Sequence, residues 1–487
     1  MERIKFIHIA AVYSIVYFSV LPFYRYQINP DCVSYIAVAE KYAEGNFAQA
    51  VNIYWSPLIS FFLIPFLLLK INALLAFKII NLGASLLLLF LFQKLSGILK
   101  VNRNYYIAGS LVLFPLLLWK SFSINTPDLL SAGTLLFFLF SILKSGSGKR
   151  DYVQIGLAGV LAYLAKYYNL YFILLFLLIW PVVHSKGIKR TGIIICLTIV
   201  TCFSLLWMLI CFSKYKVFST GSSPAYNFSI IAPGNGEKYP GEKGGNNDYL
   251  DYTTFRYTSW EEPFLYEVKY WNPFEGRTDF NYYLREVIFK NCFDFFRSYW
   301  IYAAALFLFL LPGRVFFRNR DFVLILLFSF LYPLAYFFSI YENRYVIASE
   351  VSWIILLLCL FCVHEQKLLP KAGAAIALFY TAASYTIQII THSNTGKPVF
   401  EMSGEVKGKI SPEWSVYSSP GCWGEGVYVC YHNRLKFYDA VAPEKFIQSE
   451  EKNSIFICRK KEFDSMPELR RSTVVYLDND FCVLKSD

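Results

Sequence analysis

Five ionisable residues, far apart in the sequence, are the first candidates for chemistry. Asp31 follows the first hydrophobic run, Asp128 opens a later one, and Lys166 separates two others. Glu342 and Arg344 immediately precede a further run. A carboxylate can take a proton from an attacking hydroxyl, and Lys and Arg can bind an anion. An ionisable group deep in a bilayer costs about 2.5–3.5 kcal/mol even on lenient scales, so a functional role is the default interpretation.

The composition is that of a polytopic membrane protein. Of 487 residues, 56% are hydrophobic and only 17% are charged, whereas a soluble protein of this length carries more charge. Hydrophobic runs of about 20 residues, enough to cross a bilayer as a helix, recur along the chain. The net charge of +11 comes from cations between these runs, so it does not indicate nucleic-acid binding. The predicted fold is a mainly α, transmembrane helical bundle.

We predict about eleven spans, with the N-terminus inside and the C-terminus outside. The spans are placed at residues 6–24, 74–95, 104–120, 128–144, 152–165, 169–184, 191–213, 298–312, 321–340, 346–363 and 372–391. This topology puts Lys and Arg in every inner connection, as the positive-inside rule requires. The apolar stretch 57–70 is interpreted as a helix at the outer face, because counting it as a span would place the basic cluster around Lys94 outside.

Two domains are expected. A transmembrane domain covers residues 1–392 and has long outer loops at 25–73 and 214–297. The first of these loops contains an amphipathic helix with Lys41 on its polar side. Residues 393–487 form a small extracytoplasmic α/β domain, because short strand patterns alternate there with a helical one. One or two disulfides could form in this domain if it lies outside the cytoplasm, among Cys422, Cys430, Cys458 and Cys482.

With this topology, all five ionisable residues fall on the outer face. Each also has a purely structural interpretation. Asp31 could be the N-cap of the amphipathic helix, and Asp128 could favour the dipole of the helix that follows Thr-Pro. Lys166 and Arg344 could extend along the bundle to the interface. These interpretations do not explain why acids and bases share one face, and we therefore expect a polar cavity there.

The order of several short motifs resembles the GT-C glycosyltransferases, in particular the subgroup of the bacterial aminoarabinose transferase and the protein O-mannosyltransferases. The motifs are Asp31 in the first outer loop, Trp55-Ser56-Pro57-Leu58, Thr126-Pro127-Asp128, Leu164-Ala165-Lys166-Tyr167 and Asn343-Arg344-Tyr345. The resemblance spans roughly residues 1–392. It implies a sugar donor linked to polyprenyl phosphate and an active site on the outer, periplasmic side of a bacterial inner membrane. The chain departs from the family pattern at Cys32, after the first acid, and lacks the proline that follows Arg-Tyr.

Transfer from a lipid phosphate requires a base and cations, and the resemblance assigns them. Asp31 is the predicted catalytic base of an inverting transfer to a hydroxyl or phosphate of a lipid, glycan or protein acceptor. The predicted ligands of the donor phosphate are Lys166, Arg344 and, more weakly, Arg25. Substrate-orienting roles are predicted for Asp128, Glu342, Tyr345, Tyr35 and Trp55. No cofactor is assigned and metal dependence is left open, because a divalent metal would fit if Asp31 met Glu40 or Asp128.

The sequence is also compared with what two other functions would require. A transporter or flippase of lipid-linked sugars predicts internal repeats and polar residues near the middle of the membrane, whereas here the charges lie at span ends and no repeat is visible. A non-catalytic assembly protein would leave Asp31 and Lys166 replaceable.

Overall fold

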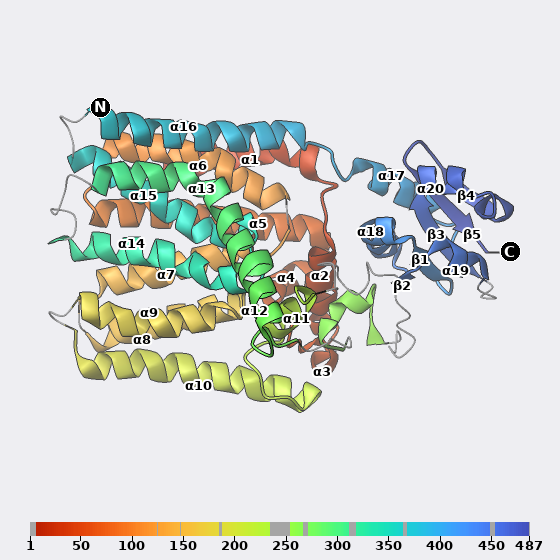
Figure 1. The fold of residues 1–487 in the computed structure, drawn as a ribbon, viewed down its shortest axis with the longest axis horizontal. Coiled ribbons are helices and arrows are strands. Elements are labelled where there is room, and N and C mark those ends of the chain that lie inside the picture. The colour runs from red at the N-terminus through yellow and green to blue at the C-terminus, as the bar shows by residue number, and fades with distance from the viewer. Residues whose placement is uncertain are drawn as a thin grey trace.

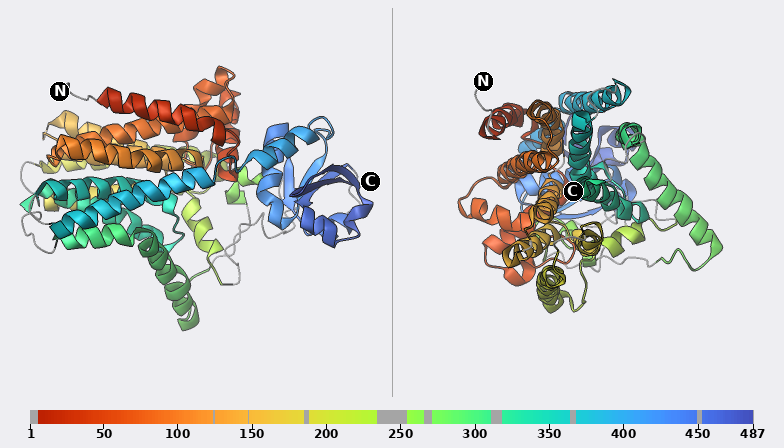
Figure 2. Two further views of the ribbon diagram at one scale, coloured as in Figure 1. Left: turned by 90° about the horizontal axis from the view of Figure 1, so that it is seen from above. Right: turned by 90° about the vertical axis from the view of Figure 1, so that its left-hand side faces the viewer.

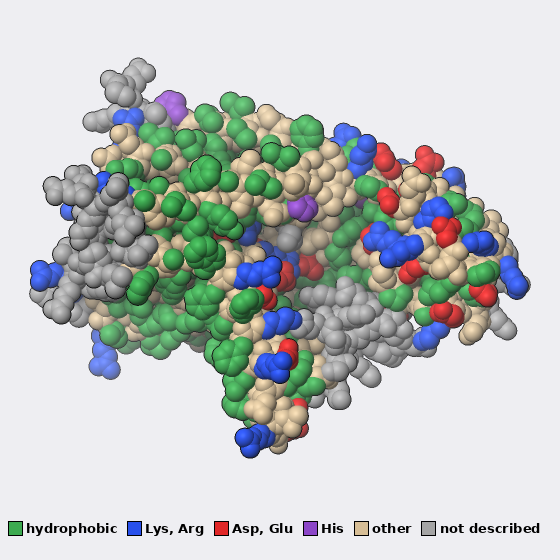
Figure 3. Space-filling view, turned by 45° about the horizontal axis from the view of Figure 1, so that its top comes forward, with side chains coloured by type: hydrophobic (Ala, Val, Ile, Leu, Met, Phe, Trp, Pro, Cys, Tyr) green, Lys and Arg blue, Asp and Glu red, His purple; other side chains and the backbone are tan. Residues whose placement is uncertain are grey.

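The structure, a computed structural model, describes residues 6–123, 125–146, 148–184, 188–233, 254–265, 271–310, 318–363, 368–448 and 453–486. A bundle of long helices carries a small α/β domain at one end (Figure 1). The views in Figure 2 show the same arrangement, with the C-terminal domain beyond the ends of the helices. Hydrophobic side chains cover the bundle, and charged side chains gather over the C-terminal domain and in a hollow beside it (Figure 3).

Every predicted span overlaps one long helix. These helices are α1 (Phe6–Tyr24), α5 (Ala73–Ile98), α6 (Arg103–Ser123), α7 (Asp128–Lys144), α8 (Lys149–Ala165), α9 (Asn169–Val183), α10 (Arg190–Tyr215), α13 (Lys290–Leu310), α14 (Arg320–Leu334), α15 (Ile347–Val363) and α16 (Leu368–Thr391). Within the described residues, seven helical segments are long and apolar enough to cross a membrane. Helices satisfy their own backbone hydrogen bonds, which is the condition for crossing lipid.

The helices differ in how deeply they are buried. In the apolar window of α15, 83% of the residues are buried, against 22% for α1 and 28% for α10. Helix α15 is therefore the centre of the bundle, whereas α1 and α10 present most of their surface to lipid. Helix α10 lies close to α8 because Gly192 has no side chain, and a Cβ there would clash with the ring of Tyr152.

The first outer loop folds into three short helices. They are α2 (Pro30–Ala43), α3 (Phe47–Ala50) and α4 (Leu58–Leu68). Helix α4 has 11 residues, which is too short to span a bilayer, and it packs against α2 and α5. The location of the stretch 57–70 at the outer face stays a prediction. Lys41 differs from expectation, because it is buried in an ion pair of 2.7 Å with Glu261 of the second outer loop. This pairing could not be foreseen from the helix pattern alone.

The second outer loop contributes several short helices around the same end of the bundle. They are α11 (Ser223–Ile230), η3 (Ser259–Glu261), η4 (Pro263–Leu265), α12 (Arg277–Tyr282) and the π-helix η5 (Tyr283–Phe289). Helices α12, η5 and α13 form one continuous helix that tilts out of the bundle (Figure 2). The helix therefore begins well before residue 298, the predicted start of this span. Two short helices, η7 (Ala335–Phe338) and η8 (Asn343–Val346), connect α14 to α15.

The C-terminal domain contains a five-stranded sheet in the order β2-β1-β3-β5-β4. Its strands are β1 (Ser415–Ser418), β2 (Phe437–Ala440), β3 (Ser454–Arg459), β4 (Thr473–Leu477) and β5 (Phe481–Lys485), and its helices include α17 (Lys397–Val406), α18 (Trp423–Asn433), α19 (Pro443–Gln448) and α20 (Lys460–Ser465). Strands β1, β2 and β3 are parallel, and β4 and β5 are antiparallel, so the domain is the small α/β unit expected. Its four cysteines are buried and free, with Cys458 opposite Cys482 across two strands.

The predicted topology places the hairpin at Lys166 and the C-terminal domain on the same, outer side of the membrane. Alkaline phosphatase, which is active only outside the cytoplasm, should therefore be active when fused after residue 168 or after residue 393. A fusion after Lys144 should be inactive, because this basic connection lies inside. Enzymatic activity of the Lys144 fusion equal to that of the other two would contradict the topology.

Candidate functional site

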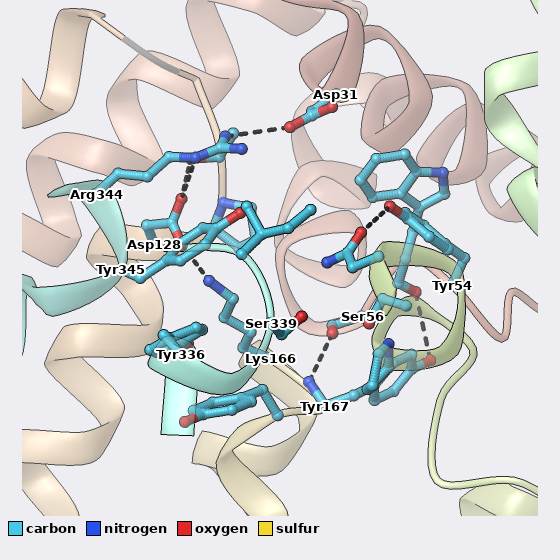
Figure 4. A pocket seen from close by; sticks show the side chains of 18 of the residues that line it. Asp31, Tyr54, Ser56, Asp128, Lys166, Tyr167, Tyr336, Ser339, Arg344 and Tyr345 are labelled. Atoms are coloured by element: carbon cyan, nitrogen blue, oxygen red, sulfur yellow. Dashed lines mark hydrogen bonds and ion pairs between the residues drawn. The ribbon is translucent and has the colours of Figure 1, made fainter. Parts of the chain in front are cut away.

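Four of the predicted acids and bases, Asp31, Asp128, Lys166 and Arg344, line one cavity at the end of the bundle that carries the C-terminal domain (Figure 4). The cavity has a volume of about 260 Å³. Its lining includes most of the predicted site residues, namely Asp31, Tyr35, Trp55, Asp128, Lys166, Arg344 and Tyr345. These residues come from the first outer loop, the start of α7, the α8–α9 hairpin and the α14–α15 connection. Residues more than 300 positions apart in the sequence thus share one site.

Arg344 is the centre of the charge network. Its Nη1 lies 3.1 Å from Asp31 Oδ2, and its Nε lies 2.7 Å from Glu342 Oε2 and 3.7 Å from Asp128 Oδ2. One guanidinium therefore faces three carboxylates from three different segments. A planar guanidinium with five N–H groups can do this, whereas a lysine ammonium is a point charge.

Lys166 is the second cation of the site. It is the C-cap residue of α8, and its Nζ lies 2.8 Å from Asp128 Oδ1. The same Nζ lies 3.6 Å from the centre of the Tyr345 ring, a cation–π contact that directs the ammonium toward the cavity. Burial lowers the pKa of Lys166, and the Asp128 carboxylate opposes this shift.

Asp128 holds the two cations together, and its local sequence explains its position. It is the first residue of α7, directly after Pro127, where an acid is favoured by the helix dipole. The hydroxyl of Thr126 donates a hydrogen bond of 2.6 Å to Asp128 Oδ2 rather than capping the backbone. The carboxylate is 7% exposed and bonds Lys166 and Thr126 at the same time. Asp128 is thus both the helix-start residue and the electrostatic link of the site.

Asp31 is not the N-cap of α2, although its position in the sequence allowed that role. The N-cap of α2 is Asn29, whose side chain accepts a hydrogen bond from the N–H of Cys32. Asp31 lies in the first turn, where its two oxygens contact different partners. Oδ2 contacts Arg344 at 3.1 Å, and Oδ1 accepts a hydrogen bond of 3.1 Å from the indole of Trp260. The carboxylate remains partly exposed, at 22%, and lines the cavity.

Aromatic side chains form most of the remaining wall. The rings of Tyr35 and Trp55 meet edge to face at 5.0 Å, and Tyr54 and Trp260 extend this wall. The opposite wall includes Tyr345, stacked on Tyr336 with ring centres 4.8 Å apart. Aromatic faces with a few polar groups are a common environment for binding an organic ligand.

A second cavity, of about 680 Å³, adjoins the first. Both cavities are lined by Thr126, Asp128 and Arg344. The second also has Glu342, Lys120, Arg297 and His392 in its lining. Asp128 and Arg344 therefore lie between the two cavities, and ligands bound in the two cavities would both contact these side chains.

Some predicted contributions are not found at the site. Arg25 lines neither cavity, and its guanidinium is exposed and bonded to the hydroxyl of its neighbour Tyr26. Glu40 lies further along α2 and pairs with Arg256 at 2.7 Å, so it does not meet Asp31. Arg344 lies between Asp31 and Asp128. Among the described residues, no group of three or more His, Cys, Asp or Glu side chains is arranged to hold a metal ion.

The residue that the sequence analysis missed is Trp260. It lies within Thr258-Ser259-Trp260-Glu261, where Thr258 and Glu261 form a capping box around the short helix η3. The Thr-x-x-Glu spacing is a recognisable signal for a helix start. That signal would have indicated an ordered turn inside the long loop, although not its contact with Asp31.

Comparisons with known proteins bear on the fold. No protein-family model and no curated protein matches the sequence. Among solved structures, ArnT from Cupriavidus metallidurans matches in its apo state (12% identity, TM-score 0.58, 97% of each chain) and bound to undecaprenyl phosphate (12%, 0.56, 98% of this chain and 97% of that one). The archaeal oligosaccharyltransferase AglB from Archaeoglobus fulgidus, in complex with an inhibitory peptide and a dolichol-phosphate, matches at 11% identity and TM-score 0.53, over 94% of this chain and 70% of its own.

ArnT and AglB are both GT-C glycosyltransferases. At such low identity the likeness is one of fold, and it extends over nearly the whole of this chain. The chain is therefore an integral membrane protein with the GT-C fold, and the resemblance predicted from its short motifs is confirmed at this level.

Replacing Asp128 by Asn should destabilise the protein, because Lys166 and Arg344 would lose a shared, buried partner. Breaking a buried ion pair from one side costs about 3 kcal/mol or more in the free energy of unfolding. Asp464→Asn is the matched control, since its pair with Lys460 lies at the surface and should contribute at most about 1 kcal/mol. Thermal unfolding in detergent compares the two variants, and equal midpoints would contradict a structural role for Asp128.

Proposed function

We propose that the protein transfers a sugar from a polyprenyl-phosphate donor to an acceptor hydroxyl or phosphate at the outer face of the membrane. The observation that carries this proposal is the convergence of Asp31, Arg344 and Lys166 in one cavity of a GT-C fold. ArnT binds undecaprenyl phosphate and AglB a dolichol-phosphate, and these lipids are of the class proposed here. The acceptor is a lipid, a glycan or a protein.

Asp31 serves as the base in this proposal. The acceptor oxygen attacks the anomeric carbon, its proton passes to the Asp31 carboxylate, and the bond from that carbon to the phosphate oxygen breaks. The polyprenyl phosphate leaves with the bonding electrons. A single displacement of this kind inverts the anomeric carbon. The 22% exposure of Asp31 and its place in the cavity lining leave it accessible to an acceptor.

Arg344 and Lys166 bind the donor phosphate in this proposal. Three carboxylates face these two cations, so one carboxylate has to release Arg344 when a phosphate arrives. Glu342 is the best candidate, because its side chain is 33% exposed, against 22% for Asp31 and 7% for Asp128. The incoming phosphate takes over the position of Glu342 on the guanidinium. The N–H groups of Arg344 and Lys166 are then already in place to stabilise the negative charge that develops on the leaving phosphate.

The membrane setting suits such a donor. The prenyl tail lies in the bilayer among the spans, and the head group reaches the outer ends of the helices. The charged side chains start or end helices, with Asp128 at the beginning of α7 and Lys166 at the end of α8. A transporter would need charges near the middle of the membrane. A periplasmic active site in a bacterial inner membrane follows from the predicted topology together with the resemblance.

Wild-type protein in detergent should transfer or hydrolyse at least one member of a panel of radiolabelled polyprenyl-phosphate sugars. Asp31→Asn should lower the rate by roughly a hundredfold or more, which is the usual contribution of a general base. The amide keeps the shape of the side chain but cannot accept the proton.

Equal rates for the wild type and Asp31→Asn would remove Asp31 from the chemistry. A wild type that turns over no donor, yet binds one and moves it across vesicle membranes, would contradict the transferase and support the transporter.

Arg344→Lys should raise the KM for the donor by about tenfold or more, because an ammonium cannot form the two parallel hydrogen bonds that a guanidinium offers a phosphate. Arg25→Lys is the matched control, since Arg25 is exposed and lines neither cavity. Initial rates over a range of donor concentrations give both KM values. A KM changed equally in the two variants would contradict the assignment of Arg344.

A further inference from the structure

We propose that Trp260 is the positioning residue of Asp31, and that the C-terminal domain keeps Trp260 in place. This inference rests on the proposed function and adds a role for two parts of the chain that do not react themselves. These parts are the segment 254–265 of the second outer loop and helix α18 of the C-terminal domain.

The indole of Trp260 fixes the orientation of the Asp31 carboxylate. Its Nε1–H donates to Asp31 Oδ1 at 3.1 Å, while Arg344 contacts Oδ2 at the same distance. The indole therefore keeps Oδ1 away from the guanidinium. Without it, both carboxylate oxygens could turn to Arg344 in a bidentate pair, the geometry that arginine prefers. Each carboxylate oxygen has two lone pairs, so Oδ1 can accept the indole hydrogen bond and still receive a proton.

The backbone of Trp260 is also bound by residues of the first outer loop. Its carbonyl oxygen accepts hydrogen bonds of 3.1 Å from the hydroxyl of Ser34 and from the indole of Trp55. Ser34 lies on α2 three residues after Asp31. Both the side chain and the backbone of Trp260 thus bind the helix that carries the proposed base, and Trp260 itself is 2% exposed.

The segment around Trp260 is anchored by a buried acid. Glu261 is fully buried, and its carboxylate pairs with Lys41 of α2 at 2.7 Å. The same carboxylate accepts hydrogen bonds from the backbone N–H groups of Arg256 and Tyr257. A buried carboxylate with several partners stabilises one position of the loop, because each partner would lose its hydrogen bond if the segment moved.

The C-terminal domain covers this segment from the other side. The ring of Trp423, the first residue of α18, meets the Trp260 ring edge to face at 5.9 Å. The N–H of Phe437 in β2 donates to the carbonyl of Tyr257 at 2.7 Å, so the loop continues the edge of the sheet. Helix α18 also packs on α2. Trp260 therefore lies between Trp423 of the C-terminal domain and Asp31 of α2, in contact with both.

Three variants test this inference. Trp260→Phe keeps an aromatic ring but removes the N–H group. Trp423→Ala removes the ring that covers Trp260. Trp271→Phe is the matched control, because Trp271 donates the same kind of hydrogen bond, 3.0 Å long, to Asp279 in the same outer loop. For each variant, kcat and the donor KM are measured together with the midpoint of thermal unfolding in detergent.

Trp260→Phe should lower kcat by about ten- to a hundredfold, the effect of losing a hydrogen bond to a charged group, with the donor KM changed less than about twofold. Trp423→Ala should lower kcat in the wild-type background but not further in Trp260→Phe, because residues that act through one another are not additive. Trp271→Phe should leave kcat unchanged.

Several results would overturn the inference. They are an unchanged kcat in Trp260→Phe, additive effects of Trp260→Phe and Trp423→Ala, or a loss of kcat that merely follows a lowered unfolding midpoint. In each of these cases an active wild type would leave the proposed function standing. A wild type inactive on every donor would contradict the proposed function and this inference together.

Discussion

The site depends on one guanidinium that faces three carboxylates. Arg344 contacts Asp31, Asp128 and Glu342, and these acids come from the first outer loop, the start of α7 and the α14–α15 connection. Each carboxylate alone would be costly at the edge of a bilayer. Together with Lys166 they form a compact network in which every charge has an opposite neighbour. The network contains three acids and two cations, so in the proposed function a phosphate can bind Arg344 only when one carboxylate moves away from the guanidinium.

The rest of the structure can be understood as the support of this network. The bundle places Asp128 at the start of α7 and Lys166 at the end of the neighbouring helix α8. Asp31 lies on a short helix outside the bundle, and such a helix needs further support. The loop segment at Trp260 and the C-terminal domain supply it through buried contacts.

The helices and most of the site residues could be predicted from the sequence, whereas the contacts between distant segments could not. Hydrophobic runs and basic connections predict the helices, and the clustering of acids and bases on one face predicts a cavity containing Asp31, Asp128, Lys166 and Arg344. Contacts between distant segments leave no periodic pattern. Lys41 has the sequence pattern of a solvated residue, but in the fold it pairs with Glu261. The sequence around Trp260 carries no signal for its contact with Asp31. Arg25, predicted as a weaker phosphate ligand, lines neither cavity.

The most direct test of this account is an experimental structure of the protein with undecaprenyl phosphate bound. The account predicts the phosphate between Arg344 and Lys166, with Glu342 turned away from the guanidinium and Asp31 still held by Trp260. A phosphate bound elsewhere, with Arg344 still paired to Glu342, would contradict the assignment of the donor site.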